Sequence, residues 1–292
     1  MAVTSRRNLL TGSLLAGPGL LSIRATANDR GGELLRAIAG LEQRHGGRLG
    51  VAVLDGSATM PIAHRGDERF AMTSTFKFVA AAFVLARVDR GEESLTRRIA
   101  YARDYLVTYS PVTEKHAGGG GMAVGEICEA AVTLSDNTAG NLLLDSFGGP
   151  AGLTAYMRSL GDGVSRLDRR ETALNEATPG DPRDTTSPAA MAEVLRRTVL
   201  GTALSGSSRE QLAAWLVGNK TGDKRLRAGV PPGWRVGDKT GSGANNTTND
   251  IAVIWPPGRE PIVVAAYYAE ARASDDERNA VLAEVGRLAV RM

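Results

Sequence analysis

Short strand-like segments near both ends of the chain enclose a long helical middle, and this order limits the possible folds more than any other feature. Apolar runs bounded by turn residues predict the strands. In chain order the predicted strands are residues 49–54, 60–64, 234–236, 250–255 and 262–268. Apolar residues at helical spacing predict helices at residues 33–44 and 275–291, and over most of residues 73–218.

The economical fold for this order is an antiparallel sheet built from both chain ends and flanked by helices, with an inserted helical domain. The fold class is therefore α/β plus all-α. We expect residues 28–68 and 218–292 to form the α/β domain. Residues 69–217 are expected to form the inserted all-α domain.

The N-terminal segment has the pattern of an export signal. Residues 1–27 contain the pair Arg6-Arg7, an interrupted apolar stretch and Ala25-Thr26-Ala27, which fits a cleavage site. We expect a twin-arginine-type signal peptide and a periplasmic or secreted mature protein; the alternative is a ragged N-terminus. Of the 35 basic residues, three lie in this segment, and the remaining 32 equal the 32 acidic residues. The expected mature chain is neutral, so its charge gives no indication of nucleic-acid binding.

Cysteine and histidine are too rare and too scattered for common metal sites. The single cysteine, Cys128, excludes an intramolecular disulfide and a cysteine-cluster metal site. The three histidines have no metal-ligand spacing. We expect no metal and no cofactor. A monomer is the default expectation, because no apolar seam stands out in the sequence.

Ser74-Thr75-Phe76-Lys77 opens a predicted helix and is the first of three polar motifs. Residues at i and i+3 share one helical face, so Lys77 can lie beside the Ser74 hydroxyl. A serine hydroxyl becomes a good nucleophile when a neighbouring base takes its proton. The alternative is a helix-capping serine followed by a surface lysine.

The second and third motifs also have a functional and a structural interpretation. Ser135-Asp136-Asn137 lies between two helical stretches; it can supply a proton relay and a substrate-binding amide, or it can cap the second helix. Lys239-Thr240-Gly241-Ser242-Gly243 ends a strand-like stretch. Its lysine and hydroxyls can attract a carboxylate at a strand edge, or it can be an ordinary strand end followed by a glycine turn.

These three motifs, in this order, resemble those of serine β-lactamases and penicillin-binding proteins. Glu171, within residues 169–175 (RRETALN), resembles the E-x-x-L-N element of class A β-lactamases, which penicillin-binding proteins lack. The resemblance covers the chain from about Arg48 to the C-terminus. It implies a β-lactamase/transpeptidase-like fold and hydrolysis of β-lactams by an acyl-serine route, a resistance activity. The rivals are a transpeptidase or carboxypeptidase and a penicillin-sensing binding module.

The resemblance also implies a role for each site residue. Ser74 is the nucleophile, and Lys77 or Glu171 is the acylation base. The Ser135 hydroxyl, in contact with Lys77 and Lys239, protonates the leaving nitrogen. Glu171 with Asn175 activates the deacylating water. The implied substrate-binding residues are Tyr109, Asn137, Asn175, Arg225, Lys239, Thr240, Gly241 and Ser242, with Arg227 as an alternative to Arg225.

A loop around Glu171 is part of the same resemblance. An Ω-type loop over residues 169–184 is expected to be closed by an Arg169–Asp184 pair, with a cis peptide between Glu171 and Thr172. Penicillins and cephalosporins are the expected substrates, and carbapenems are expected to be poor ones.

Overall fold

The computed structural model describes residues 1–2, 19–56 and 60–292. Most of the predicted signal peptide therefore lies outside the described residues. Helix α1 (Gly19–His45) begins 14 residues before the predicted start at residue 33 and includes the expected cleavage site. It ends at His45, because Gly46 and Gly47 follow with φ of 70° and 76°. No helix in the described part of the chain is long and apolar enough to cross a membrane.

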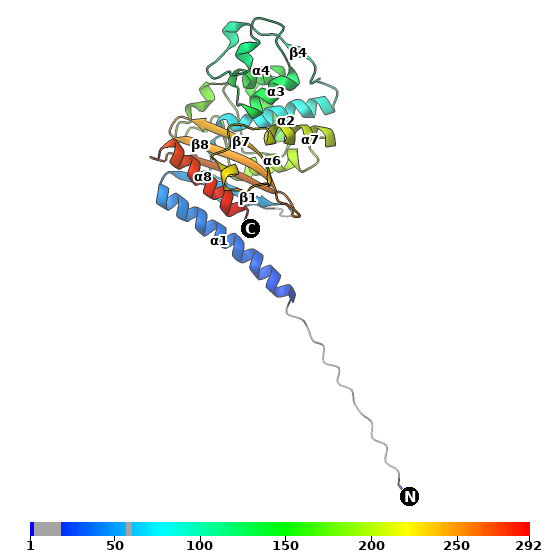
Figure 1. Cartoon of the computed structure of the whole chain (residues 1–292), viewed down its shortest axis with the longest axis vertical. Coiled ribbons are helices and arrows are strands. Elements are labelled where there is room, and N and C mark those ends of the chain that lie inside the picture. The colour runs from blue at the N-terminus through cyan, green and yellow to red at the C-terminus, as the bar shows by residue number, and fades with distance from the viewer. Residues whose placement is uncertain (3–18, 57–59) are drawn as a thin grey trace.

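A five-stranded antiparallel sheet in the order β2-β1-β9-β8-β7 forms the centre of the fold (Figure 1). Its strands are β1 (Arg48–Asp55), β2 (Ile62–His64), β7 (Arg235–Gly243), β8 (Thr247–Trp255) and β9 (Ile262–Ala269). Strands from the two ends of the sequence meet where β1 pairs with β9 along its whole length. This arrangement, with the helices described next, confirms the predicted fold class.

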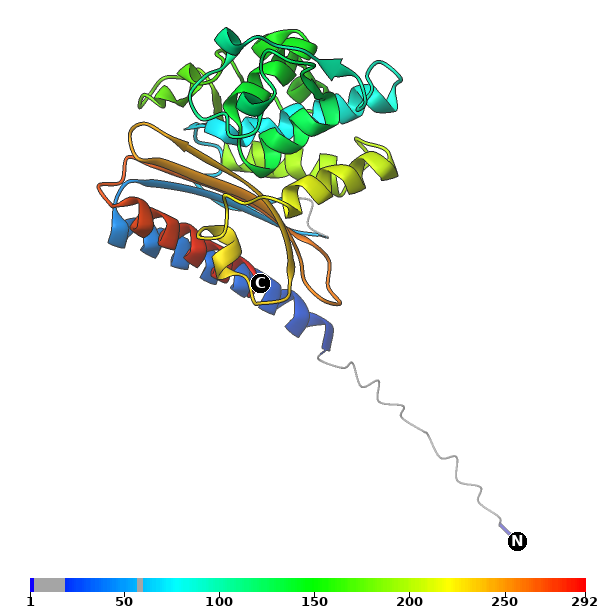
Figure 2. The same ribbon diagram turned by 45° about the horizontal axis from the view of Figure 1, so that its top comes forward.

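Helices cover both faces of the sheet (Figure 2). Helices α1 and α8 (Asp275–Ala289) pack on one face, and α6 (Pro188–Val199) and α7 (Gly206–Val217) pack on the other. Alternate side chains of β1 serve the two faces. Val51 joins the apolar core under α1 and α8, whereas Ala52 and Leu54 join the core under the remaining helices.

The helical layer lies beyond α6 and α7. Its α-helices are α2 (Phe76–Asp89), α3 (Val124–Thr133), α4 (Asn137–Ser146) and α5 (Gly149–Ser159). Short 3-10 helices are η1 (Thr73–Thr75), η2 (Arg103–Tyr105), η3 (Thr113–Lys115), η4 (Ala173–Glu176) and η5 (Leu226–Gly229). Two-stranded ladders join β3 (Phe70–Ala71) to β6 (Thr185–Thr186) and β4 (Arg98–Ile99) to β5 (Met122–Ala123).

Strands β7 and β8 extend well beyond the apolar runs that predicted them. The apolar run at residues 234–236 covers only the start of β7, whose end is the Lys239–Gly243 motif, as expected. The apolar run at residues 250–255 missed Thr247 to Asn249. The rest of β7 is polar yet largely buried, and it faces η1. A Cβ atom built on Gly241 would lie 2.1 Å from Thr73 Oγ1, so this strand needs glycine to approach the turn that carries Ser74. Apolar periodicity does not detect such a strand.

Candidate active site

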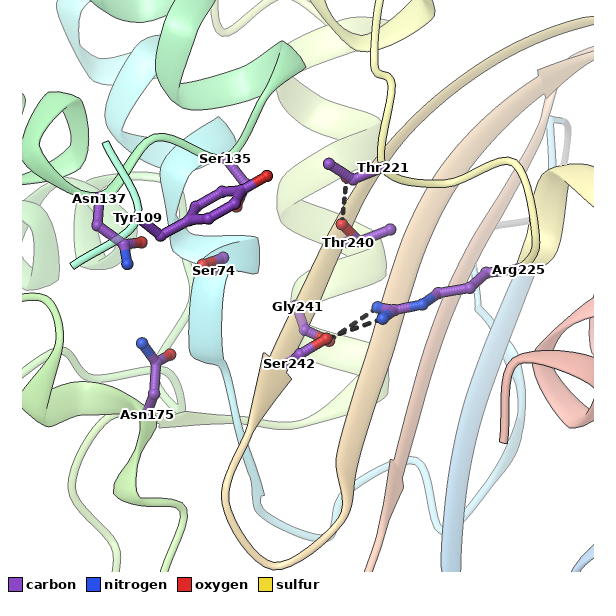
Figure 3. Close-up of a pocket in the computed structure, with 10 residues that line it drawn as sticks. All are labelled: Ser74, Tyr109, Ser135, Asn137, Asn175, Thr221, Arg225, Thr240, Gly241 and Ser242. Atoms are coloured by element: carbon purple, nitrogen blue, oxygen red, sulfur yellow. Dashed lines mark hydrogen bonds between the residues drawn. The ribbon is translucent and has the colours of Figure 1, made fainter. Parts of the chain in front are cut away.

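A cleft of about 260 Å³ opens between the helical layer and the edge strand β7 (Figure 3). Its lining residues are Ser74, Tyr109, Ser135, Asn137, Asn175, Thr221, Arg225, Thr240, Gly241 and Ser242. All of these except Thr221 were predicted from the sequence. The other predicted residues, Lys77, Glu171 and Lys239, lie directly behind the lining and are bonded to it. The structure therefore brings all twelve predicted residues together.

Ser74 lies in η1, one turn before Lys77 in α2. Lys77 Nζ donates to Ser74 Oγ at 2.9 Å, and Ser74 Oγ donates to Glu171 Oε1 at 3.3 Å. Lys77 Nζ and Glu171 Oε1 form an ion pair at 2.8 Å, with both side chains fully buried. The hydroxyl thus has two basic groups in reach.

The surroundings of Lys77 have opposing effects on its pKa. Burial lowers the pKa of Lys77, while the Glu171 carboxylate and, less strongly, Asp136 act in the opposite direction. The ammonium also donates to the Ser135 carbonyl at 2.9 Å and to Asn137 Oδ1 at 2.6 Å. A lysine in this environment can exchange a proton with neighbouring groups.

Two asparagine side chains hold Glu171 through three hydrogen bonds. Asn175 Nδ2 donates to Glu171 Oε2 at 2.5 Å. The Asn141 side chain pairs with both the N–H and the C=O of Glu171 at 3.0 Å each. The Glu171–Thr172 peptide is cis, as predicted.

The loop that carries Glu171 is closed as predicted. Arg169 Nε donates to Asp184 Oδ2 at 2.6 Å, and Asp184 Oδ1 accepts the N–H groups of Asp168 and Arg169 at 2.8 Å each. The Asp184 carbonyl also accepts the N–H of Met72 at 2.8 Å. The end of the loop is therefore bonded to the turn that precedes Ser74.

Both interpretations of the Ser135-Asp136-Asn137 motif apply, because its middle residue caps a helix and its outer residues line the cleft. Asp136 caps α4 by accepting the N–H of Ala139 at 2.9 Å, which turns its two neighbours toward the cleft. Lys239 Nζ donates to Ser135 Oγ at 2.9 Å. One expectation needs correction: Lys77 contacts the Ser135 carbonyl, and the hydrogen bonds of the described residues include none from Lys77 to its hydroxyl.

The sheet side of the cleft concentrates positive charge. Lys239 is fully buried, and burial together with the nearby Lys77 charge brings its pKa well below the usual value for a lysine. Two acids lie behind it on β7 and β8. Burial raises the pKa of both Asp238 and Asp250.

Arg225 reaches the cleft and Arg227 does not. Arg225 NH2 donates to Ser242 Oγ at 2.8 Å, and its NH1 donates to the Gly241 carbonyl at 2.9 Å (Figure 3). Arg227 instead bonds through Nε to the buried Asp238 at 3.0 Å. Of the two alternatives from the sequence, only Arg225 is placed to meet a ligand.

Two residues of the site escaped the sequence analysis. Thr221 follows α7 in an ordinary glycine turn, and the sequence carries no signal for it. Asn141 did carry a signal, because it repeats Asn137 at i+4 on one face of the predicted helix. A buried asparagine at that spacing indicates a polar partner, which is the backbone of Glu171.

Comparison with known proteins agrees with this geometry. Residues 33–292 match the family described as Beta-lactamase enzyme family. The chain is 45% identical over 288 residues to Beta-lactamase Toho-1 of Escherichia coli, across 99% of this chain and 98% of that relative. It is 51% identical over 252 residues to Beta-lactamase AST-1 of Nocardia asteroides, across 86% of this chain and 81% of that relative.

Solved structures give the same result. An ancestral (GNCA) class A β-lactamase is 67% identical, with a TM-score of 0.87 over 88% of this chain and 99% of that structure. The class A β-lactamase of the last common ancestor of Gram-negative bacteria (GNCA4) is 64% identical, with a TM-score of 0.86 over 88% and 98%. Family match, identity and fold agree, and the chain belongs to the class A β-lactamases of the β-lactamase enzyme family.

Proposed function

We propose that this protein hydrolyses the amide of the β-lactam ring through an acyl-enzyme on Ser74. The observation that carries the proposal is the position of Glu171. Its Oε1 lies 3.3 Å from the nucleophile and its Oε2 is bonded to Asn175 at the cleft wall. A carboxylate beside the acylated serine is what hydrolysis of the ester requires.

In the acylation step, Ser74 Oγ attacks the ring carbonyl carbon and its proton passes to Lys77 or Glu171. Both groups are in hydrogen-bond contact with the hydroxyl. The backbone N–H groups of Ser74 and Ser242 would stabilise the oxyanion. The close approach of β7 supports this pairing, because a Cβ on Gly241 would lie 3.3 Å from Ser74 N. Ser135 then gives its proton to the ring nitrogen as the C–N bond breaks, and its contact with Lys239 Nζ supports that role. The proton taken from Ser74 returns to Ser135, so the base and Ser135 both regain their starting protonation states.

In the deacylation step, Glu171 takes a proton from water, and the hydroxide attacks the ester carbonyl. The C–O bond to Ser74 breaks, and the serine regains its proton. Asn175 supports the placement of that water: its Nδ2 bonds Glu171, and its buried Oδ1 has no hydrogen-bond partner among the described residues. A buried acceptor without a protein partner, on a residue that lines the cleft, is suited to a water or to a substrate amide.

Substrate recognition is assigned to the two cleft walls. Lys239, Thr240, Ser242 and Arg225 would bind the substrate carboxylate through charged and hydroxyl donors. On the opposite wall, Asn137 would bind the substrate side-chain amide, and the exposed ring of Tyr109 would border the cleft entrance.

Cellular placement and assembly complete the proposal. Export is typical of class A β-lactamases, and we propose that residues 1–27 act as a twin-arginine-type signal that delivers the protein to the periplasm or the medium. We further propose that the mature protein is a monomer.

The nucleophile provides the decisive test. Ser74→Ala is expected to abolish nitrocefin turnover and the covalent adduct seen by intact-mass analysis, because no neighbouring group replaces the hydroxyl. Wild-type protein should turn over and return to its free mass. A wild-type adduct that persists would identify a penicillin-sensing module, and release of the acyl group to an amine but not to water would identify a transpeptidase.

The substrate range rests on Ser242, which adds a hydroxyl at the strand edge beside the proposed carboxylate site. We expect benzylpenicillin and cephalothin to be good substrates and imipenem to be a poor one. Steady-state kinetics on the three compounds check this. A kcat/KM for imipenem equal to that for benzylpenicillin would contradict the proposed range.

A further inference from the structure

The turn that presents Ser74 has a backbone conformation that its own sequence does not favour. Thr73, the residue before the nucleophile, has a φ of 45°. A β-branched residue rarely adopts this left-handed region, so surrounding contacts have to hold it there. Those contacts determine the direction of the Ser74 N–H and hydroxyl.

The side chain of Asn249, on β8, contacts three consecutive residues of this turn. Asn249 Nδ2 donates to the Ala71 carbonyl at 2.9 Å and to Thr73 Oγ1 at 3.0 Å, and it lies 3.4 Å from the Met72 carbonyl. The side chain is completely buried. Its orientation is fixed chemically, since two carbonyl oxygens face it and only the NH2 group can donate to them.

The cross-strand partner of Asn249 is Gly241, and the two act as a unit. Directly paired residues of antiparallel strands point to the same face of the sheet, so both face the turn. Gly241 leaves the space into which Thr73 packs, because a Cβ there would lie 2.1 Å from Thr73 Oγ1. Asn249 supplies the hydrogen bonds that hold the turn in this space.

The backbone of Asn249 extends the link to the other end of the cleft. Its carbonyl accepts from Arg225 NH1 at 2.7 Å. The same strand position therefore contacts the turn before the nucleophile through its side chain and the proposed carboxylate-binding arginine through its backbone. Substitution of the side chain changes the first contact and keeps the second acceptor.

We propose that Asn249 is a positioning residue for acylation, which holds the Thr73 turn against β7 so that Ser74 and Ser242 keep the spacing an oxyanion needs. This inference rests on the proposed function. It predicts that substitution of Asn249 impairs acylation selectively, because Glu171 is held by Asn141 and Asn175 and not by Asn249. Acylation should slow while activation of the deacylating water is largely kept.

Asn249→Asp tests this most sharply, since it keeps the shape and turns an acceptor toward the Ala71 carbonyl. Stopped-flow nitrocefin kinetics combined with quenched-flow mass analysis give the acylation and deacylation rate constants separately. We expect acylation to fall at least tenfold and deacylation to change less than threefold. Unchanged acylation in a variant with wild-type circular dichroism would overturn the inference and leave the proposed function intact.

Thr248→Val is the matched control on the same strand. It removes a buried hydroxyl that accepts from Arg278 Nε at 2.9 Å, away from the Thr73 turn. Acylation by this variant should stay within twofold of wild type. An equal loss in Thr248→Val would show that any lost hydrogen bond on β8 has the same effect and would overturn the specific role of Asn249.

A double-mutant cycle decides the matter if Asn249→Asp does not fold. Thr73→Val removes the hydroxyl that accepts from Asn249 Nδ2 and donates to the Met72 carbonyl. Loss of the bond to Asn249 alone corresponds to about a fivefold slower acylation. Asn249→Ala should add much less in the Thr73→Val background than in the wild type. Additive effects would overturn the inference. A wild-type protein without β-lactam turnover would instead refute the proposed function.

Discussion

The two walls of the cleft differ in whether their buried cations are paired with an acid. On the helical wall, the Lys77 ammonium and the Glu171 carboxylate are in direct contact at 2.8 Å, and both touch the Ser74 hydroxyl. On the sheet wall, Lys239 and Arg225 contact only neutral oxygens among the described residues. Lys239 donates to the Ser135 hydroxyl across the cleft and to the Thr240 carbonyl. Arg225 donates to the Gly241 carbonyl and the Ser242 hydroxyl on β7. The acids nearest to them, Asp238 and Asp250, lie behind the strand.

This difference suits the paired groups of the helical wall to proton transfer and the cations of the sheet wall to substrate binding. A paired acid and base that share one hydroxyl can transfer its proton over short distances. Cations whose partners are only neutral oxygens keep their capacity to attract an anion, and a substrate carboxylate would complete the sheet wall. Substitution of Lys77 or Glu171 should therefore change rate constants, and substitution of Lys239 or Arg225 should change binding.

The largest expected effect is on the helical wall. Glu171→Ala should allow acylation and slow deacylation by a factor of about 100 to 10,000, the usual contribution of a general base. Intact-mass analysis after mixing with benzylpenicillin should show a stable adduct on Ser74. Rapid return of this variant to its free mass would mean that another group activates the water, and the proposed division between the walls would fail.

The architecture could be predicted from the sequence because it depends on simple patterns. The apolar runs of β1 and β9 and the helical spacing of α8 indicated a sheet made from both chain ends. The strand ends at Lys239–Gly243 and at Thr247–Asn249 could not be located in the same way. They are polar and form strands because of tertiary pairing and the close approach of Gly241 to Thr73.

The site was predicted from sequence motifs, so only residues that belong to a motif could be assigned to it. Ser74, Ser135 and Lys239 belong to short patterns with a clear chemistry, and the structure places all three at the cleft. Asn249 belongs to no such pattern. Its importance depends on a cross-strand pairing and on the φ of Thr73, which exist only in the folded chain.

An intermediate effect is expected on the sheet wall. Arg225→Ala removes one charged donor to the substrate carboxylate, a loss of about 1–3 kcal/mol that corresponds to roughly a 5- to 150-fold weaker interaction. KM should therefore rise more than kcat falls. Steady-state kinetics on benzylpenicillin measure both constants.

Arg227→Ala is the matched control for that experiment. It leaves the buried Asp238 without its arginine, so the free energy of unfolding should fall by about 3–5 kcal/mol. KM should stay close to the wild-type value, because Arg227 does not line the cleft. A rise of KM in Arg227→Ala and not in Arg225→Ala would reverse the assignment of the carboxylate site.

The smallest expected effect concerns pH and the charge of Lys239. Burial and the nearby Lys77 charge lower the pKa of Lys239, so this lysine loses its proton at a pH below the usual value of about 10.4. The charged form predominates below that pKa and binds the substrate carboxylate. As pH rises through the folded-state pKa, the charge disappears and binding should weaken, by about three- to tenfold, because Arg225 and the hydroxyls remain.

The Ser74→Ala variant isolates this binding step, since it removes the chemistry. Its Kd for intact benzylpenicillin should be constant at pH values below the folded-state pKa of Lys239 and rise as the pH passes through that pKa. The added substitution Lys239→Arg should flatten that rise, because a guanidinium stays protonated throughout this range. Titration of Lys77 would give an alkaline loss that Lys239→Arg leaves unchanged. Such a result would assign the pH dependence to the helical wall and contradict the role of the Lys239 charge in recognition.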